Sequence, residues 1–420
     1  MSDSLSVSAA RRALYAMLAA GVVSLIGNAL TAVALPWFVL QTTGSPAQAG
    51  LVGFAQSLPH LAAGLMGGIL VDRLGYTRIA IASDLVSGVT VAFIPLLYYT
   101  VGLNFWVLLV LVFLGAMLDV PGLTARRAML PELATQADMP LSRANAWFES
   151  AQSIAWLVGP PIAGILIAAI GAAGVIVIDA ITFAVSILLM VAFIPKLAPV
   201  ARQATGKLRE ELLAGLRFIR HDPVLLWMAI GLAISNCLSA PLTSVILPVY
   251  VTETSNRASD LGLLLSAGSV GILTGALLYG AIGHRVSRRT IWLVGYAMSP
   301  LVYWTLAAMV PFWALIVVSA VSYIAMGPIN PLMVTVRHER APHELRGRVF
   351  ASYSAIAMSA GPIGMLVGGY FVEEAGLRPT VLALAIAGQL LALAMVFIPA
   401  FSRLGESAVP KPDQPAESSM

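Results

Sequence analysis

The sequence is poor in charged residues, in histidine and in cysteine. Only 10% of its 420 residues are Asp, Glu, Lys or Arg, whereas a soluble globular domain carries about a quarter. The single cysteine, Cys237, excludes an internal disulfide and a cysteine-based metal cluster, and the five histidines are scattered without metal-ligand spacing. We therefore expect no metal site. A composition that is 59% hydrophobic, with a mean hydropathy of +0.89, indicates an integral membrane protein.

Two further absences bear on chemistry. The chain has no Gly-x-x-x-x-Gly-Lys-Ser/Thr run, so we do not expect ATP as the direct source of energy. It also has no cluster of paired acids and no His/acid set at one membrane face, which argues against an enzyme. We expect no cofactor.

Long apolar runs occupy most of the chain. A helix that crosses the ~30 Å hydrocarbon layer needs about 20 mostly apolar residues. Windows of this length predict an all-α integral membrane protein with twelve transmembrane helices in two six-helix pseudo-repeats. The predicted spans are 14–40, 48–71, 77–99, 103–125, 145–169, 173–194, 223–250, 258–283, 289–310, 312–335, 347–371 and 379–399.

Basic residues fall on alternate loops. Lys and Arg are retained in the cytoplasm, and with the N-terminus inside, all 24 except Arg257 and Arg378 lie on the cytoplasmic side or just within those helix ends. The formal net charge of +4 therefore reflects membrane topology, and we expect no nucleic-acid partner. We predict a multi-pass protein of the inner (cytoplasmic) membrane with both termini in the cytoplasm.

The longest polar segment divides the predicted helices six and six. Within it, apolar residues recur on one helical face with basic residues opposite, which predicts an amphipathic helix on the inner membrane surface. Asp222 and Pro223 then form a suitable start for the seventh helix. The predicted regions are an N-terminus (1–13), two six-helix bundles (14–194 and 223–402), the cytoplasmic linker between them (195–222) and a disordered tail (403–420).

A short charged turn occurs twice, half the chain apart. The segment "GILVDRLGYTR" (68–78) lies between the second and third spans, and "GAIGHRVSRRT" (280–290) lies between the eighth and ninth. Their alignment superposes Gly68 on Gly280, Asp72 on His284, Arg73 on Arg285 and Tyr76 on Arg288. Because "GPPIAG" (159–164) and "GPIGML" (361–366) recur at nearly the same offset, we interpret the chain as a duplicated six-helix unit.

These features closely resemble the major facilitator superfamily over residues 10–402. The resemblance rests on the twelve spans in two like halves, the Gly-x-x-x-Asp-Arg-x-Gly turn and its degenerate second copy. Stretches such as "ALPWFVLQTTGSPAQAGLV" and "RRAMLPELATQADMPLSRANA" are similar to the drug, macrolide and enterobactin exporter branch. The resemblance implies a monomeric transporter whose halves move about a central site near the bilayer midplane.

The resemblance also implies that the charged turn latches the inner side of the protein in the outward-facing state. Independently, Asp72 can lie near the positive N-terminus of a neighbouring helix, and Arg73 can reach a carboxylate. The gating residues are Gly68, Asp72, Arg73, Gly75, Arg78, Arg285 and Arg288. The chain departs from the family in "LGAMLDVPGL", which lacks the family's helix-4 arginine, and at Ala163, where the antiporter motif usually has glycine.

Ionisable side chains inside a bilayer are costly, so each is a candidate for proton coupling. Asp119 can carry a proton or form a structural ion pair with Arg73 or Arg126. Asp84 can instead be a partner for Arg78 or for the Arg126/Arg127 pair. Glu149 can complement a helix dipole, His60 can be buried neutral, and Asp179 can cap a helix at the interface. The proton-coupling candidates are Asp119, Glu149, His60, Asp84 and Asp179.

Uncharged polar and aromatic residues at membrane depth are candidates for the substrate cavity. Each has an alternative role, either in an interhelical hydrogen bond or as an interfacial or lipid-facing aromatic residue. The cavity candidates are Asn28, Gln56, Gln152, Trp156, Asn236, Tyr323, Asn330 and Tyr353. Asn28 and Asn236 stand in repeat-equivalent helices that line the cavity in the family.

The sequence therefore predicts a secondary exporter of amphiphilic small molecules that exchanges them for protons. Its partners would be the small-molecule substrate, protons and the lipid bilayer. A proton-coupled importer or a uniporter of a small nutrient is the alternative within transport. A membrane enzyme or a lipid scramblase is the alternative from a different class.

Overall fold

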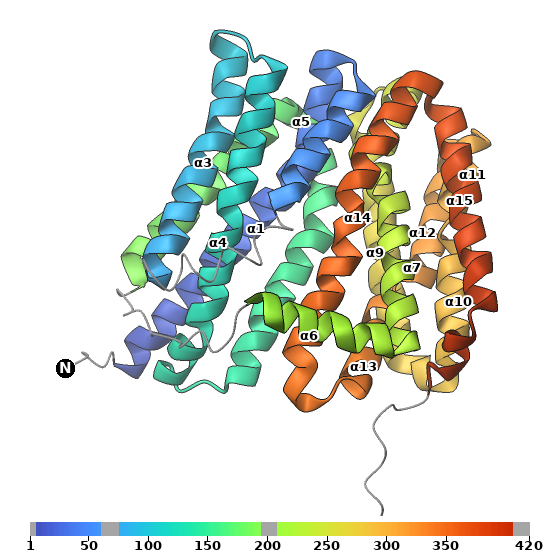
Figure 1. Ribbon diagram of the computed structural model, residues 1–420. Helices are drawn as coiled ribbons and strands as arrows, with labels where there is room; N and C mark the ends of the chain where they lie inside the picture. Colours follow the sequence, from blue (N-terminus) through green and yellow to red (C-terminus); the bar gives the residue numbers. More distant parts are fainter. Residues whose placement is uncertain (1–5, 60–74, 195–207, 406–420) are drawn as a thin grey trace, which may run out of the picture. The chain divides into compact units, whose positions relative to one another are not determined.

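The computed structural model describes residues 6–59, 75–194 and 208–405, and all regular structure in these ranges is helical (Figure 1). In the first half of the chain, α1 is followed by a helix whose described part covers residues 46–59, and then by α3, α4 and α5. Their bounds are α1 Val7–Thr43, α3 Tyr76–Thr100, α4 Phe105–Gln136 and α5 Leu141–Phe193.

In the second half, several spans are built from consecutive short helices. α6 (Leu208–His221) precedes the α7, η1 and α8 span, and α9, α10, α11, α12, α13, α14 and α15 follow. Their bounds are α7 Pro223–Pro241, η1 Leu242–Ile246, α8 Leu247–Thr254, α9 Ala258–Ile282, α10 Arg288–Met298, α11 Leu301–Ala307, α12 Phe312–Met326, α13 Ile329–Arg340, α14 Arg346–Ala375 and α15 Leu377–Phe397. Short 3-10 turns are η2 Gly283–Arg285, η3 His343–Leu345 and η4 Pro399–Arg403.

Proline and glycine explain where the spans are interrupted. Pro241, Pro300 and Pro328 stand at the breaks after α7, before α11 and before α13, because a proline supplies no backbone N–H to the preceding turn. Gly171 divides α5, since its φ of 76° and ψ of 162° are not helical. α5 therefore comprises the two predicted spans 145–169 and 173–194.

The twelve predicted spans agree with this architecture. Nine helical stretches of the described residues are long and apolar enough to cross a membrane. One of them, α5, supplies two spans. The helix at 46–59 belongs to a span that is described only in part, and α10 with α11 forms the interrupted ninth span.

The packing divides the chain into two compact units. Unit 1 contains Met1–Gln203, Cys237–Ser269 and Gly361–Val381, and unit 2 contains Ala204–Asn236, Val270–Ala360 and Leu382–Met420. Four helices of the second half, α7, α9, α14 and α15, therefore contribute one end to unit 1. These units do not follow the predicted bundle boundaries at 14–194 and 223–402, which stay a prediction.

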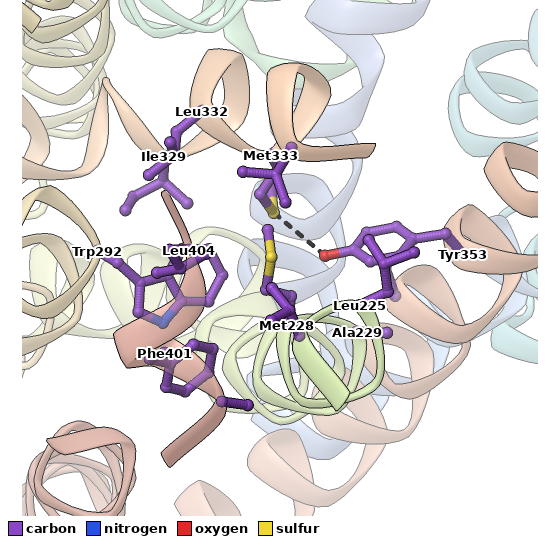
Figure 2. Packing of buried hydrophobic residues seen from close by; sticks show 14 of the residues in the cluster. Leu225, Met228, Ala229, Trp292, Ile329, Leu332, Met333, Tyr353, Phe401 and Leu404 are labelled. Carbon is purple, nitrogen blue, oxygen red and sulfur yellow. Dashed lines mark hydrogen bonds between the residues drawn. The ribbon is translucent and has the colours of Figure 1, made fainter. Parts of the chain in front are cut away.

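Each unit has a core of its own. In unit 1, α1, α3, α4 and α5 contribute the buried side chains of Leu14, Met17, Ile79, Met129 and Phe148, among others. In unit 2, buried side chains of α7, α10, α13, α14 and η4 pack into one cluster that includes Trp292, as Figure 2 shows. The Tyr353 hydroxyl donates to Met333 Sδ at 3.4 Å in this second core.

The helix expected in the linker is α6, which runs crosswise to α7 of the same unit (Figure 1). Ile219 packs into the unit 2 core, whereas Leu213 and Leu216 are exposed on the helix surface. Gly215 lets α6 cross α14 closely, because a Cβ at this position would lie 2.3 Å from the Arg348 carbonyl oxygen. An exposed apolar edge on a basic helix suits the membrane surface.

Gly171 provides a test of the break inside α5. The backbone conformation of this residue is accessible essentially to glycine alone, so Gly171→Val is expected to cost about 1–3 kcal/mol. We expect a lower thermal midpoint in detergent. The control is Gly280→Ala, since a Cβ on this helical glycine has no neighbouring atom within 4 Å. Equal midpoints for the two variants would contradict the assignment.

Candidate functional site

Two acids of unit 1, the half-buried Asp119 and the buried Asp179, contact the same turn of α1. Asn28 donates from Nδ2 to Asp119 Oδ2 of α4 at 2.9 Å. Thr31 donates from Oγ1 to Asp179 Oδ2 of α5 at 2.6 Å. Residues three apart share a helix face, so one turn of α1 binds acids from two other helices.

A glycine permits this close approach. A Cβ on Gly27 would lie 2.2 Å from Asp179 Oδ1 and 2.1 Å from Thr182 Oγ1. The Thr182 hydroxyl is 2.7 Å from the Asp179 carbonyl oxygen and 3.3 Å from Asp179 Oδ1. Asp179 is 0% exposed, and within the described part of the chain no basic side chain forms an ion pair with it. Its polar neighbours are hydroxyl groups.

Asp84 has a different environment. It forms an ion pair with Arg126 of α4, and both side chains are buried. Ser186 of α5 donates to Asp84 Oδ2 at 2.6 Å, and Arg126 Nη2 lies 3.0 Å from Ser186 Oγ. Of the partners that the sequence suggested for Asp84, the structure selects Arg126.

The remaining first-half candidates lie in more open surroundings. Glu149 Oε1 accepts from Arg127 Nη2 at 2.7 Å, and both side chains are more than half exposed. Trp156 is exposed, and Gln56 is half-buried. The Gln152 amide nitrogen is buried without a hydrogen-bond acceptor in the described ranges.

The second-half candidates of unit 2 divide into buried and accessible residues. Asn236 Nδ2 donates to the Ala357 carbonyl oxygen at 2.7 Å, which joins α7 to α14. Tyr353 is 1% exposed and belongs to the core in Figure 2. Tyr323 is half-buried and Asn330 is exposed. The environments of Asn236 and Tyr353 favour the packing role over contact with a substrate.

The gating residues are described only in part. Gly68, Asp72 and Arg73, together with the coupling candidate His60, lie outside the described residues. Gly75 precedes α3 with a φ of 85°, and Arg78 is exposed on its first turns.

In the second copy of the turn, Arg285 Nε lies 3.4 Å from His284 Nε2. Arg288 Nη2 donates to Glu339 Oε1 at 2.9 Å, and Arg288 Nη1 contacts Glu339 Oε2. This paired contact fastens the start of α10 to α13.

Asp222 is both a cap and an ion-pair partner. Its Oδ1 accepts from the backbone N–H groups of Val224 at 2.9 Å and Leu225 at 3.1 Å, so the predicted start of the seventh helix is confirmed. Arg340 Nη1 donates to Asp222 Oδ2 at 3.0 Å, and Arg340 Nη2 donates to the Arg403 carbonyl oxygen at 2.7 Å. This ion pair, which was not predicted from the sequence, binds α7, α13 and η4 together.

Long apolar helices throughout the described residues, with acids buried between helices of unit 1, are the features of a multi-pass membrane transporter. The chain belongs to the Major Facilitator Superfamily, whose family model matches residues 17–256 and 234–419. It is 37% identical over 404 residues to the multidrug efflux pump Tap of Mycolicibacterium fortuitum, covering 94% of this chain and 97% of that protein.

Two more distant proteins are similar over most of the chain. Macrolide efflux protein A of Streptococcus pyogenes is 23% identical over 376 residues, which cover 87% of this chain and 90% of that protein. The solved structure of the nucleoside transporter NupG superposes with a TM-score of 0.77 at 13% identity, covering 92% of this chain and 98% of the other. The predicted family and fold are confirmed.

The contrast between the two ion pairs of unit 1 is testable. Asp84→Asn leaves the buried Arg126 charge without its partner, so we expect a loss of about 3–5 kcal/mol in unfolding free energy. Glu149→Gln breaks the exposed pair with Arg127 and is expected to cost at most about 1 kcal/mol. Denaturant unfolding in detergent measures both. Similar losses in the two variants would mean that the Asp84 pair is not a structural anchor.

Proposed function

We propose that this protein is a secondary efflux transporter that exports amphiphilic small molecules, such as drugs and toxic or secondary metabolites, in exchange for protons. The observation that carries the proposal is the 37% identity to the multidrug efflux pump Tap over 94% of the chain. Transport, rather than a catalysed reaction, is the proposed activity. The protein acts as a monomer in the cytoplasmic membrane, with both termini inside and alternating access to the two sides.

Asp179 and Asp119 are the proposed proton carriers. Hydroxyl groups surround the Asp179 carboxyl, and a hydroxyl can accept from a protonated acid or donate to a carboxylate. The site therefore accommodates both protonation states, although the charged state has the larger desolvation cost. Asp84 is less suited to this role because it is engaged in a buried ion pair with Arg126.

Helix α1 links proton binding to substrate movement in this proposal. Asn28 and Thr31 hold the two acids on one face of α1, and the first helix lines the cavity in this family. A protonated Asp179 can donate to the Thr31 hydroxyl, whereas the Asn28 amide nitrogen can only donate and loses a charged acceptor when Asp119 is protonated. The turn at 28–31 therefore responds to the charge of both acids. The membrane-spanning windows contain few charged residues. A cavity formed by such helices would impose little charge selectivity, which suits the recognition of diverse amphiphilic compounds.

The proposed activity predicts a drug-resistance phenotype. Cells of a pump-deficient host that express the protein should tolerate severalfold higher concentrations of some compounds in a chemically diverse toxic panel, and should accumulate less of them. A protonophore should remove the difference, because it collapses the proton gradient. Greater accumulation in expressing cells would indicate an importer, and an effect that survives the protonophore would contradict proton exchange.

The carriers are tested in proteoliposomes with an imposed pH gradient. Asp119→Asn and Asp179→Asn should each reduce pH-driven transport to the rate of protein-free liposomes, because an amide cannot carry the proton. Substrate exchange without a gradient should continue, since the cavity is intact. Glu149→Gln is the control and should transport normally. Wild-type pH-driven rates in an aspartate variant would remove that residue from the coupling mechanism.

A further inference from the structure

Within unit 1, the helix at 46–59 and the end of α14 form one close seam. A Cβ on Gly50 would lie 2.4 Å from the Met365 carbonyl oxygen and 3.0 Å from Gly369 Cα. A Cβ on Gly369 would lie 2.7 Å from the Pro46 carbonyl oxygen. The two backbones are therefore in direct contact, and glycine at both positions permits it.

A carboxylate stands at the end of this seam. Glu373 follows Gly369 by four residues, so the two share a face of α14. Glu373 Oε2 accepts from the Ala47 backbone N–H at 2.9 Å and also accepts from the Ser45 hydroxyl.

Ser45 itself accepts from the Gln48 N–H at 3.1 Å and precedes Pro46. This is the arrangement of an N-cap residue followed by proline at the first helical position. Glu373 thus completes the N-terminal cap of a helix that lies more than 300 residues away in the sequence.

The contact joins helices from the two predicted six-helix bundles. Ser45 belongs to the loop between the first two spans, and Glu373 lies near the loop between the last two, both on the side predicted to face outward. A second crossing of the same kind joins α5 to α9, where a Cβ on Gly164 would lie 2.1 Å from Gly262 Cα. The glycines allow the helix backbones to pack closely. Glu373 in addition places a negative charge at the positive, N-terminal end of the 46–59 helix.

We propose that Glu373 is a gating residue that latches the outward-facing ends of the two bundles together. The carboxylate is bonded to the N-terminus of the 46–59 helix while these ends are closed, and it must release Ser45 and Ala47 before a central cavity can open outward. The inference rests on the proposed transport cycle only in requiring alternating access. It assigns to the outer side a charge-to-helix contact of the kind expected for Asp72 on the inner side.

The experiment measures opening directly, without substrate or a proton gradient. Cys237→Ser removes the native thiol, and Ser244→Cys introduces a reporter. Ser244 is 5% exposed and lies beneath the seam, since a Cβ on Gly53 would be 3.5 Å from Ser244 Cβ. A membrane-impermeant maleimide is applied from outside to intact cells. The labelling rate of the reporter then reports how often the seam opens.

Glu373→Ala removes the carboxylate and Ser45→Ala removes the bridging hydroxyl. Loss of a helix cap shifts an equilibrium by on the order of tenfold, so each variant should raise the labelling rate by about that factor. The matched control is Glu374→Ala, the next residue of α14. Glu374 is exposed and has no hydrogen bond or ion pair among the residues that the structure describes.

Labelling of both latch variants at the rate of Glu374→Ala would overturn the inference. A raised labelling rate in either Glu373→Ala or Ser45→Ala supports the inference. The experiment therefore remains informative if one of the two variants does not insert into the membrane. Because labelling requires no transport, raised labelling without drug export would leave the latch in place and count against the proposed substrate class alone.

Discussion

The structure depends on satisfying polar groups where water is absent. In hydrocarbon an uncompensated charge is costly, so a buried ionisable side chain between the helices is stabilised by polar partners from other helices. Asp84, Arg126 and Ser186 satisfy one another across α3, α4 and α5. These contacts fix which faces of the helices meet, in a medium where apolar contacts alone discriminate poorly between faces.

The same constraint distinguishes an acid in a structural ion pair from an acid that is proposed to bind and release a proton. Arg126 compensates the charge of Asp84 in a buried ion pair. Asp179 is surrounded by the hydroxyls of Thr31 and Thr182, which can reverse their hydrogen-bond direction. Two carboxyl groups of equal burial therefore have different chemistry, and the difference lies in one neighbouring side chain.

Much of the fold could be predicted from the sequence, because its signals are long and repeated. Apolar runs of membrane length, the duplicated turn and the alternation of basic loops predict the spans and the family. The cap at Asp222 was predictable from local spacing, and so was the amphipathic character of the linker helix. These are properties of single segments or of the whole chain.

The pairing of side chains within the bundle was not predictable in the same way. The lipid-facing and protein-facing surfaces of a transmembrane helix are both apolar, so the sequence indicates its rotation only weakly. For this reason Tyr353 was a cavity candidate, although its side chain is buried in the core of unit 2. The ion pair between Arg340 and Asp222 was likewise not predicted. The spacing of Asn28 and Thr31 was visible, but their acidic partners became apparent only from the packing of α4 and α5 on α1.

Helix α1 physically connects the two acids proposed as proton carriers to the proposed outer latch. The turn at 28–31 holds Asp119 and Asp179, and α1 continues without a break to Thr43. Gly44, with a φ of 69°, ends it and leads directly to Ser45, which Glu373 binds. The 12 residues from Thr31 to Thr43 span about 18 Å of helix at 1.5 Å per residue. A displacement of α1 along its axis at the acids would therefore act on Ser45 through this one helix, in which Pro36 removes a single backbone hydrogen bond, and through a link of one residue.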